Sequence, residues 1–117
     1  MCGRKKFEEL AGLYRSWSDG DAEFEVELTA ASALFFVGQS ARKGGFDSAF
    51  ARSLIDEGIR RVEELAVRFP EEPMVYGQRA FIHTFAEDQR QVVHDNIAKC
   101  LALDPTVDWC RKLARRY

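Results

Sequence analysis

The fold is decided by residues 53–105, which read SLIDEGIRRVEELAVRFP (53–70), EEPMVYGQRAFIHTFAEDQ (71–89) and RQVVHDNIAKCLALDP (90–105). The first and third segments each place apolar residues at helical spacing ahead of a terminal proline, Pro70 or Pro105. The two prolines are 35 residues apart, and this offset aligns Val62 with Ile97. A period in the thirties is typical of stacked helical hairpins, so the stretch predicts an all-helical domain with a repeat-like half.

The composition is that of one ordinary globular domain. The chain has 117 residues, of which 46% are hydrophobic and 31% charged, and its formal net charge is −2. A chain of this length can bury about two-thirds of its unfolded surface, so it needs no metal or disulfide to hold a core. Because the net charge is negative, no overall field attracts nucleic acid or an anionic membrane, and we expect neither as a partner.

The cysteines and the N-terminal segment favour a cytoplasmic protein. Cys2, Cys100 and Cys110 are scattered without CxxC spacing, which predicts neither a disulfide framework nor a zinc site. Free thiols in a reducing cytoplasm are the simplest interpretation, with Cys100 as a small core residue. The first ten residues, MCGRKKFEEL, lack the apolar core of a signal peptide, and no window approaches 18 apolar residues.

Apolar stripes and end signals predict six helices joined by short loops. We expect helices over residues 4–17, 22–41, 48–69, 74–86, 88–103 and from 105 onward. The second is apolar on two sides, so we expect it to pack on two sides. Gly44 and Gly45 supply its left-handed stop, and Ser53 and Gly58 are candidate positions for a bend in the long third helix. Loops this short imply antiparallel neighbours.

The expected helices divide the single domain, residues 1–117, into four parts. These are an N-terminal helix and turn (1–20), a first helical hairpin (21–70), a repeat-like hairpin (71–105) and a C-terminal capping helix (106–117). Asp21, Asp88 and Asp104 are the expected N-caps of the second, fifth and sixth helices. Asp88 also forms a capping-box-like pair with Gln91.

Residues 73–105 resemble a tetratricopeptide repeat, a pair of antiparallel helices with aromatic and small residues at fixed places and a closing proline. Tyr76 matches the aromatic residue near the start of the first helix, Ala80 the small residue one turn later, and Pro105 the closing proline. Arg79 departs from the pattern, because that family usually has an apolar residue there. The resemblance implies a tetratricopeptide-like stack of hairpins, and a compact non-repeat helical bundle is the alternative.

No catalytic, cofactor or metal-binding signature stands out in the sequence. His83 and His94 fall on adjacent expected helices, but a metal would need further ligands. Catalysis by either histidine would need a nucleophile and an orienting partner, which the sequence does not reveal. We therefore expect a protein that is not an enzyme and that holds no cofactor and no metal.

Charge is distributed unevenly along the chain. Residues 19–27 contain five acids and no base, whereas residues 106–117 contain four bases and one acid, a local charge of +3. Cations suit the C-terminus of a helix, where they oppose its dipole. An acidic protein partner or nucleic acid is the other interpretation of this basic end, and the negative net charge disfavours nucleic acid.

The function favoured by these observations is a non-catalytic interaction module, which binds a peptide or a partner helix in a groove between helices. Helical spacing places candidate groove residues on one face of the second helix and one face of the fourth. They are Phe35, Gln39, Arg42, Met74, Gln78, Phe81 and Phe85. Two alternatives remain. Phe81 and Phe85 belong to the core, or the chain is a compact accessory protein (an immunity protein, chaperone or adaptor) that binds one partner through an outer charged face.

Overall fold

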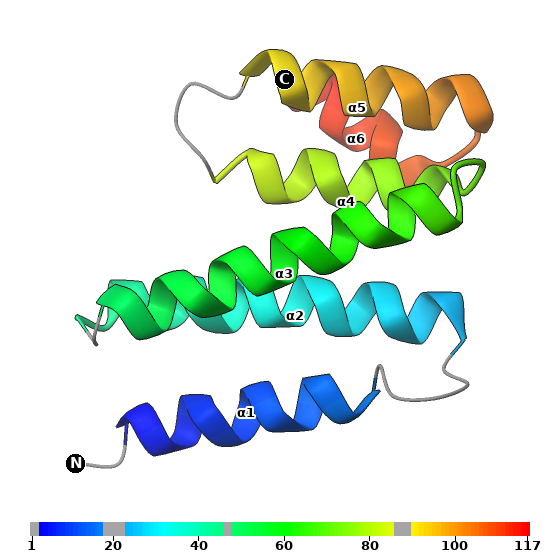
Figure 1. Cartoon of the computed structure of the whole chain (residues 1–117). Helices are drawn as coiled ribbons and strands as arrows, with labels where there is room; N and C mark the ends of the chain where they lie inside the picture. Colours follow the sequence, from blue (N-terminus) through cyan, green and yellow to red (C-terminus); the bar gives the residue numbers. More distant parts are fainter. Residues whose placement is uncertain (1–2, 18–22, 46–47, 86–89) are drawn as a thin grey trace. The chain divides into compact units, whose positions relative to one another are not determined.

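The computed structural model is all-α. It describes residues 3–17, 23–45, 48–85 and 90–117, with the side chains of Gly3 and Arg4 excepted. Within these residues the chain forms helices and no strand, as the apolar stripes predict (Figure 1). The helices are α1 (Gly3–Trp17), α2 (Phe24–Lys43), α3 (Ser48–Arg68), α4 (Pro73–His83), α5 (Arg90–Leu103) and α6 (Asp108–Arg116).

The chain divides into two units, Met1–Arg61 and Val62–Tyr117, and the boundary falls inside α3. In the first unit, α1, α2 and the first part of α3 enclose one hydrophobic core. Its centre is Ala11, Leu34, Val37 and Leu54, with Phe7, Leu10, Tyr14 and Phe50 packed around it. Half of α2 is buried, including Leu28, Leu34 and Ala41, which agrees with a helix that packs on more than one side.

Two glycines allow α2 and α3 to approach closely. A Cβ added at Gly58 would lie 2.6 Å from the backbone nitrogen of Phe35 and 2.8 Å from the carbonyl oxygen of Ala31. One added at Gly38 would lie 2.8 Å from the backbone nitrogen of Ile55. Gly58 is a candidate bend by sequence alone, but α3 is a single helix. Gly58 is instead required by the contact between the two helix backbones.

The second unit is the hairpin of α4 and α5, which run side by side, with α6 packed against both (Figure 1). Ala80, Val93, Ile97 and Leu113 form its main hydrophobic cluster. A second cluster joins Tyr76 to Cys100 and Cys110. The hydroxyl of Tyr76 donates a hydrogen bond to the carbonyl oxygen of Pro70 at 2.8 Å, which ties the start of α4 to the turn before it. The helical spacing of Val93, Ile97, Cys100 and Leu101 predicts that this face of α5 points inward, and the positions of Ile97 and Cys100 in the two clusters confirm it.

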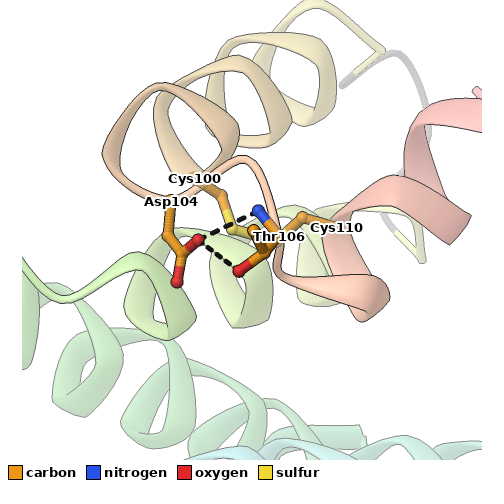
Figure 2. Close-up of a disulfide and its surroundings, with 4 residues drawn as sticks. All are labelled: Cys100, Asp104, Thr106 and Cys110. Carbon is orange, nitrogen blue, oxygen red and sulfur yellow. Dashed lines mark hydrogen bonds between the residues drawn. A yellow bond between two sulfur atoms is a disulfide. The ribbon is translucent and has the colours of Figure 1, made fainter.

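The expectation of free thiols is wrong for two of the three cysteines. Cys100 and Cys110 form a disulfide between the last turn of α5 and the first turn of α6 (Figure 2). Both residues are fully buried, and a Cβ added at Gly77 of α4 would lie 2.9 Å from the Cys110 sulfur. The Cys100 sulfur would lie 3.9 Å from the same Cβ, so Gly77 leaves room for the disulfide against α4.

The turn between α5 and α6 differs from the prediction that Asp104 caps the last helix. Its carboxylate accepts hydrogen bonds from the backbone N–H of Thr106 at 2.9 Å and from the Thr106 hydroxyl at 2.6 Å (Figure 2). These bonds lower the pKa of Asp104. They close a turn around Pro105, so α6 begins three residues later than expected, with Val107 as its N-cap. Asp104 therefore shapes the turn that brings the two cysteines together.

Other helix ends agree with the sequence signals in part. Gly45 adopts a φ of +77°, the left-handed stop expected after α2. The N-cap of α2 is Glu23, which makes no side-chain capping bond. The fourth helix is shorter than predicted, because it ends at His83 and Thr84 occupies its C-cap. The predicted caps Asp21 and Asp88 lie outside the described residues.

Candidate functional site

The seven residues predicted to line a groove divide between the two units. Phe35, Gln39 and Arg42 belong to α2 in the first unit. Phe35 is 2% exposed and Gln39 is 8% exposed, so neither offers a surface, whereas Arg42 is exposed. The physical reason is that α2 is buried on more than one face, and the face that carries Phe35 lies against Gly58 of α3.

The four predicted residues on α4 behave differently from one another. Met74, Gln78 and Phe81 are half-buried and Phe85 is exposed. Phe81 packs against the main cluster of the second unit, so the alternative that placed it in the core is correct for that residue. Phe85 lies in the turn after α4 and keeps 40% of its surface exposed.

Phe81 and Phe85 belong to a row of aromatic side chains that the sequence analysis did not find. The rings of Phe85 and Phe81 stack edge to face with centroids 5.4 Å apart, and those of Phe81 and Trp109 do so at 4.9 Å. Such pairs add about 0.5–1.5 kcal/mol beyond their buried area. The aromatic row, Phe85–Phe81–Trp109, thus runs from an exposed turn to α6.

A pocket of about 310 Å³ opens on α6 at the Trp109 end of this row. We call it the α6 pocket, and its lining residues are Trp109, Lys112, Leu113, Arg115 and Arg116. Leu113 is 2% exposed and Trp109 is half-buried, so they form an apolar floor and wall. The indole nitrogen of Trp109 is buried and donates to no acceptor within the described residues. The ring is therefore held by packing alone.

The rim of the α6 pocket is cationic. Lys112 pairs with Asp108 one turn earlier at 3.1 Å, between two largely exposed side chains. No carboxylate in the described part of the chain pairs with Arg115 or Arg116. The dipole at the C-terminus of α6 accounts for about half an elementary charge, which is less than these two cations carry. The rim thus keeps a positive charge that the described residues do not neutralise.

A second pocket, of about 320 Å³, lies between α4 and α5. Its lining residues are Tyr76, Arg79, Val92, Asp95, Asn96 and Lys99. Arg79 forms an ion pair with Glu63 of α3 at 2.9 Å, which explains the charged residue that departs from the tetratricopeptide pattern. The Lys99 ammonium lies 5.7 Å from the centroid of the Tyr76 ring. Because its polar groups already have partners, this pocket is the weaker candidate.

The histidines do not form a site with other reactive groups. His83 ends α4, and burial lowers its pKa, with Glu63 opposing and Arg79 assisting the shift. Burial therefore favours its neutral form. His94 is exposed on α5. No group of three or more potential metal ligands occurs within residues 3–17, 23–45, 48–85 and 90–117.

Two further findings complete the description of the site. Among the described helices, none has the length and apolar character needed to cross a bilayer. Comparison with protein-family models, with curated proteins and with solved structures found no match. The function of the chain is therefore inferred from the geometry of the α6 pocket and the aromatic row.

Proposed function

We propose that the chain is a non-catalytic protein–protein interaction module, which binds a peptide or a partner helix on its second unit. The observation that carries this proposal is the α6 pocket, with its apolar floor of Trp109 and Leu113 and its cationic rim. The aromatic row extends the apolar surface from the pocket to Phe85. Partly exposed aromatic residues with nearby arginines are the side chains that contribute most to protein interfaces.

The tetratricopeptide-like resemblance is part of the proposal. Tyr76 and Ala80 are buried in the hairpin of α4 and α5, as the matching residues of that family are expected to be. Helical hairpins of this kind expose surfaces suited to extended peptides or helices. Of the groove predicted from the sequence, the proposal keeps the exposed residue Phe85 and its neighbour Phe81.

A second candidate function is a compact accessory protein that binds one partner by charge alone. Arg115 and Arg116, which have no carboxylate partner among the described residues, favour it. The two candidates differ in what they require of the apolar residues: the interaction module needs the aromatic row, whereas a charged face does not. They also differ in salt dependence, because contacts between exposed charges are screened at about 8–10 Å in physiological salt.

The cellular compartment belongs to the proposal as well. A cytoplasmic location was expected partly because the cysteines were expected to be free thiols. The Cys100–Cys110 disulfide removes that reason. A buried disulfide is typical of oxidising compartments, and we propose that the chain works in one. Alkylation of thiols in intact cells, followed by mass spectrometry, would detect protected Cys100 and Cys110. Full labelling of both would contradict this part of the proposal.

The function is tested by selecting peptides of about 12 residues, some three turns of helix, from a displayed random library against the whole chain. We expect selected peptides to lose binding to the Phe85→Ser variant. The control is Val67→Ser, because Val67 is an exposed apolar residue (81% exposed) on α3 of the same unit. Thermal unfolding would verify that both variants remain folded. Selection of no peptide, or equal binding to both variants, would overturn the proposal.

A further inference from the structure

We infer that the partner of the α6 pocket is an acidic amphipathic helix, which places one large apolar side chain in the pocket and carboxylates on its rim. This inference rests on the proposed function and names the chemistry of the partner. It follows from three features of α6: the pattern of its residues, the charge it leaves unpaired and the size of its pocket.

The pattern of residues on α6 consists of two adjacent rows. Trp109 and Leu113 are four residues apart and form the apolar row. Lys112, Arg115 and Arg116 are three and four residues apart and form the basic row. Side chains at these spacings lie on one face of a helix, about 5–6 Å apart. A helix that packs along α6 thus meets apolar groups on one side of the contact and cations on the other.

Arg115 and Arg116, for which the described residues provide no carboxylate, indicate that the partner is negatively charged. Asp108 is the only acid on α6, and its contact with Lys112 is an exposed pair of the kind that contributes little. Arg115 and Arg116 have no carboxylate partner in the part of the chain that the structure describes. A partner with carboxylates would form charge-assisted, two-point hydrogen bonds with these guanidinium groups. A basic partner would be repelled.

The size of the pocket identifies an anchor side chain rather than a small-molecule ligand. About 310 Å³ is at the lower end of the range for ligand pockets, and α6 has nine residues, a length of roughly 14 Å. A partner helix can therefore contact about two to three turns of α6. A partner that offers charge alone would leave the exposed part of the Trp109 ring in contact with water, so the apolar wall of the pocket favours a partner with an apolar anchor.

The same features disfavour nucleic acid. A phosphate backbone needs a basic stripe, and here three cations line the pocket while the whole chain has a net charge of −2. The competing class becomes an outcome of the test. A single-stranded oligonucleotide that binds the α6 pocket as tightly as an acidic peptide would overturn the inference.

The experiment measures peptide binding by the fluorescence of Trp109. The sequence has two tryptophans, so the Trp17→Phe variant leaves Trp109 as the single reporter. Four synthetic helical peptides of one length are compared. They carry leucine anchors with glutamates, the same anchors with glutamines, the same anchors with lysines, and the glutamates with serines in place of the anchors. We expect the first to bind at least about tenfold more tightly than each of the others.

Matched variants connect this binding to the pocket. Arg115→Gln combined with Arg116→Gln should weaken the acidic peptide about tenfold and reduce its salt dependence. The control combines Arg52→Gln with Arg111→Gln, which removes the same charge from exposed positions outside the pocket lining. We expect less than about a twofold change from the control. Circular dichroism and thermal unfolding verify that both double variants are folded.

The outcomes separate this inference from the proposed function. Equal or tighter binding of the glutamine or lysine peptide, still dependent on the aromatic row, would overturn the acidic partner and leave the interaction module standing. Equal binding of the peptide without anchors would overturn the inference and favour the charged-face alternative. If the acidic peptide binds both double variants equally, its carboxylates do not contact the rim and the inference fails, whereas the Phe85→Ser variant still decides whether the interaction module stands.

Discussion

Gly58 offers the sharpest test of how the first unit is packed. A Cβ at this position would lie 2.6 Å from the Phe35 nitrogen, 2.8 Å from the Ala31 carbonyl oxygen and 2.9 Å from the Phe35 Cα. All three are backbone atoms of α2, so no side-chain rotation can relieve the contact. The Gly58→Ala variant therefore forces α2 and α3 apart.

The magnitude follows from two opposing effects. Alanine in place of a mid-helix glycine stabilises a helix by about 0.8–1 kcal/mol. Against this, the closest approach must lengthen from 2.6 Å to the 3.4 Å at which ordinary contact begins. A gap of about 0.5–1 Å removes a quarter to a half of the attraction between the atoms that it separates, and an extra methyl group in a packed core costs about 1–3 kcal/mol. Subtracting the helix-propensity gain from the packing cost leaves a net loss of about 0–2 kcal/mol, and because the obstacle is backbone we expect a value in the upper half of that range.

Urea denaturation of the two alanine variants isolates the packing effect. The control is Gly12→Ala on α1, because no atom lies within 4 Å of a Cβ added there. It should gain about 0.5–1 kcal/mol through helix propensity alone. If Gly58→Ala is as stable as the wild type, or gains what the control gains, then α2 and α3 are not in backbone contact and the packing described here is wrong.

Three further predictions concern a core residue, the disulfide and an ion pair. Ile97→Ala should lower the free energy of unfolding by about 2–5 kcal/mol, because Ile97 is 5% exposed, and a loss below about 0.5 kcal/mol would place its side chain in solvent. Reduction of the Cys100–Cys110 disulfide, whose sulfurs close a separation of ten residues, should cost about 2.5–3 kcal/mol by the chain-entropy model. Urea midpoints with and without dithiothreitol measure this loss of stability. The midpoint of the Cys100→Ala variant should not respond to dithiothreitol. A wild-type midpoint that stays unchanged although two titratable thiols are gained would contradict the prediction. The third concerns Glu57, whose pKa is lowered chiefly by hydrogen bonds from Arg15, the Arg15 Nε donating to both carboxylate oxygens at 3.0 Å. Its contribution to stability is therefore full above the unfolded glutamate pKa, about 4.3, and is lost as the pH falls through the lower native pKa. The Glu57→Gln variant should therefore show a weaker dependence of melting temperature on pH over that acidic range. Parallel curves of melting temperature against pH for the variant and the wild type would refute the assignment.

The helices were predictable because the apolar residues that each one buries recur at helical spacing in the sequence. The stripe through Val93, Ile97 and Cys100 predicts which face of α5 is buried, and these residues are at most 5% exposed. The stop after α2 was predictable for a different reason, since Gly45 needs a positive φ that few residues tolerate. Local chemistry and the hydrophobic pattern point to the same result at these positions.

Features that depend on two elements meeting were not predictable from spacing. The sequence around Gly58 is the same whether this glycine bends α3 or lets α2 approach closely. The short distance from an added Cβ to the backbone of Phe35 shows that the close approach is the reason. Gln39 lies on a polar position of a helical pattern, yet α2 is buried on more than one face and Gln39 is 8% exposed. In both cases the missing information is the path of the neighbouring helix.

The α6 pocket shows how one covalent bond selects a helix face. Helical spacing in the sequence predicts an apolar face of Val107, Cys110, Leu113 and Ala114, whereas the structure makes Val107 the N-cap of α6, leaves Ala114 exposed and half-buries Trp109. The helical period allows either Trp109 or Ala114 to be buried, because each lies beside the buried pair Cys110 and Leu113 on the helix surface. The disulfide to Cys100 fixes the rotation of α6 about its axis, and in that orientation the Trp109 ring stacks on Phe81 of α4. A nine-residue helix is too short to be stable alone, so the bond that holds α6 in place also determines which side chains can line a pocket. The apolar floor and the basic rim of the α6 pocket follow from that rotation. The rotation could not be predicted from the sequence, because the sequence does not show that Cys100 and Cys110 are paired.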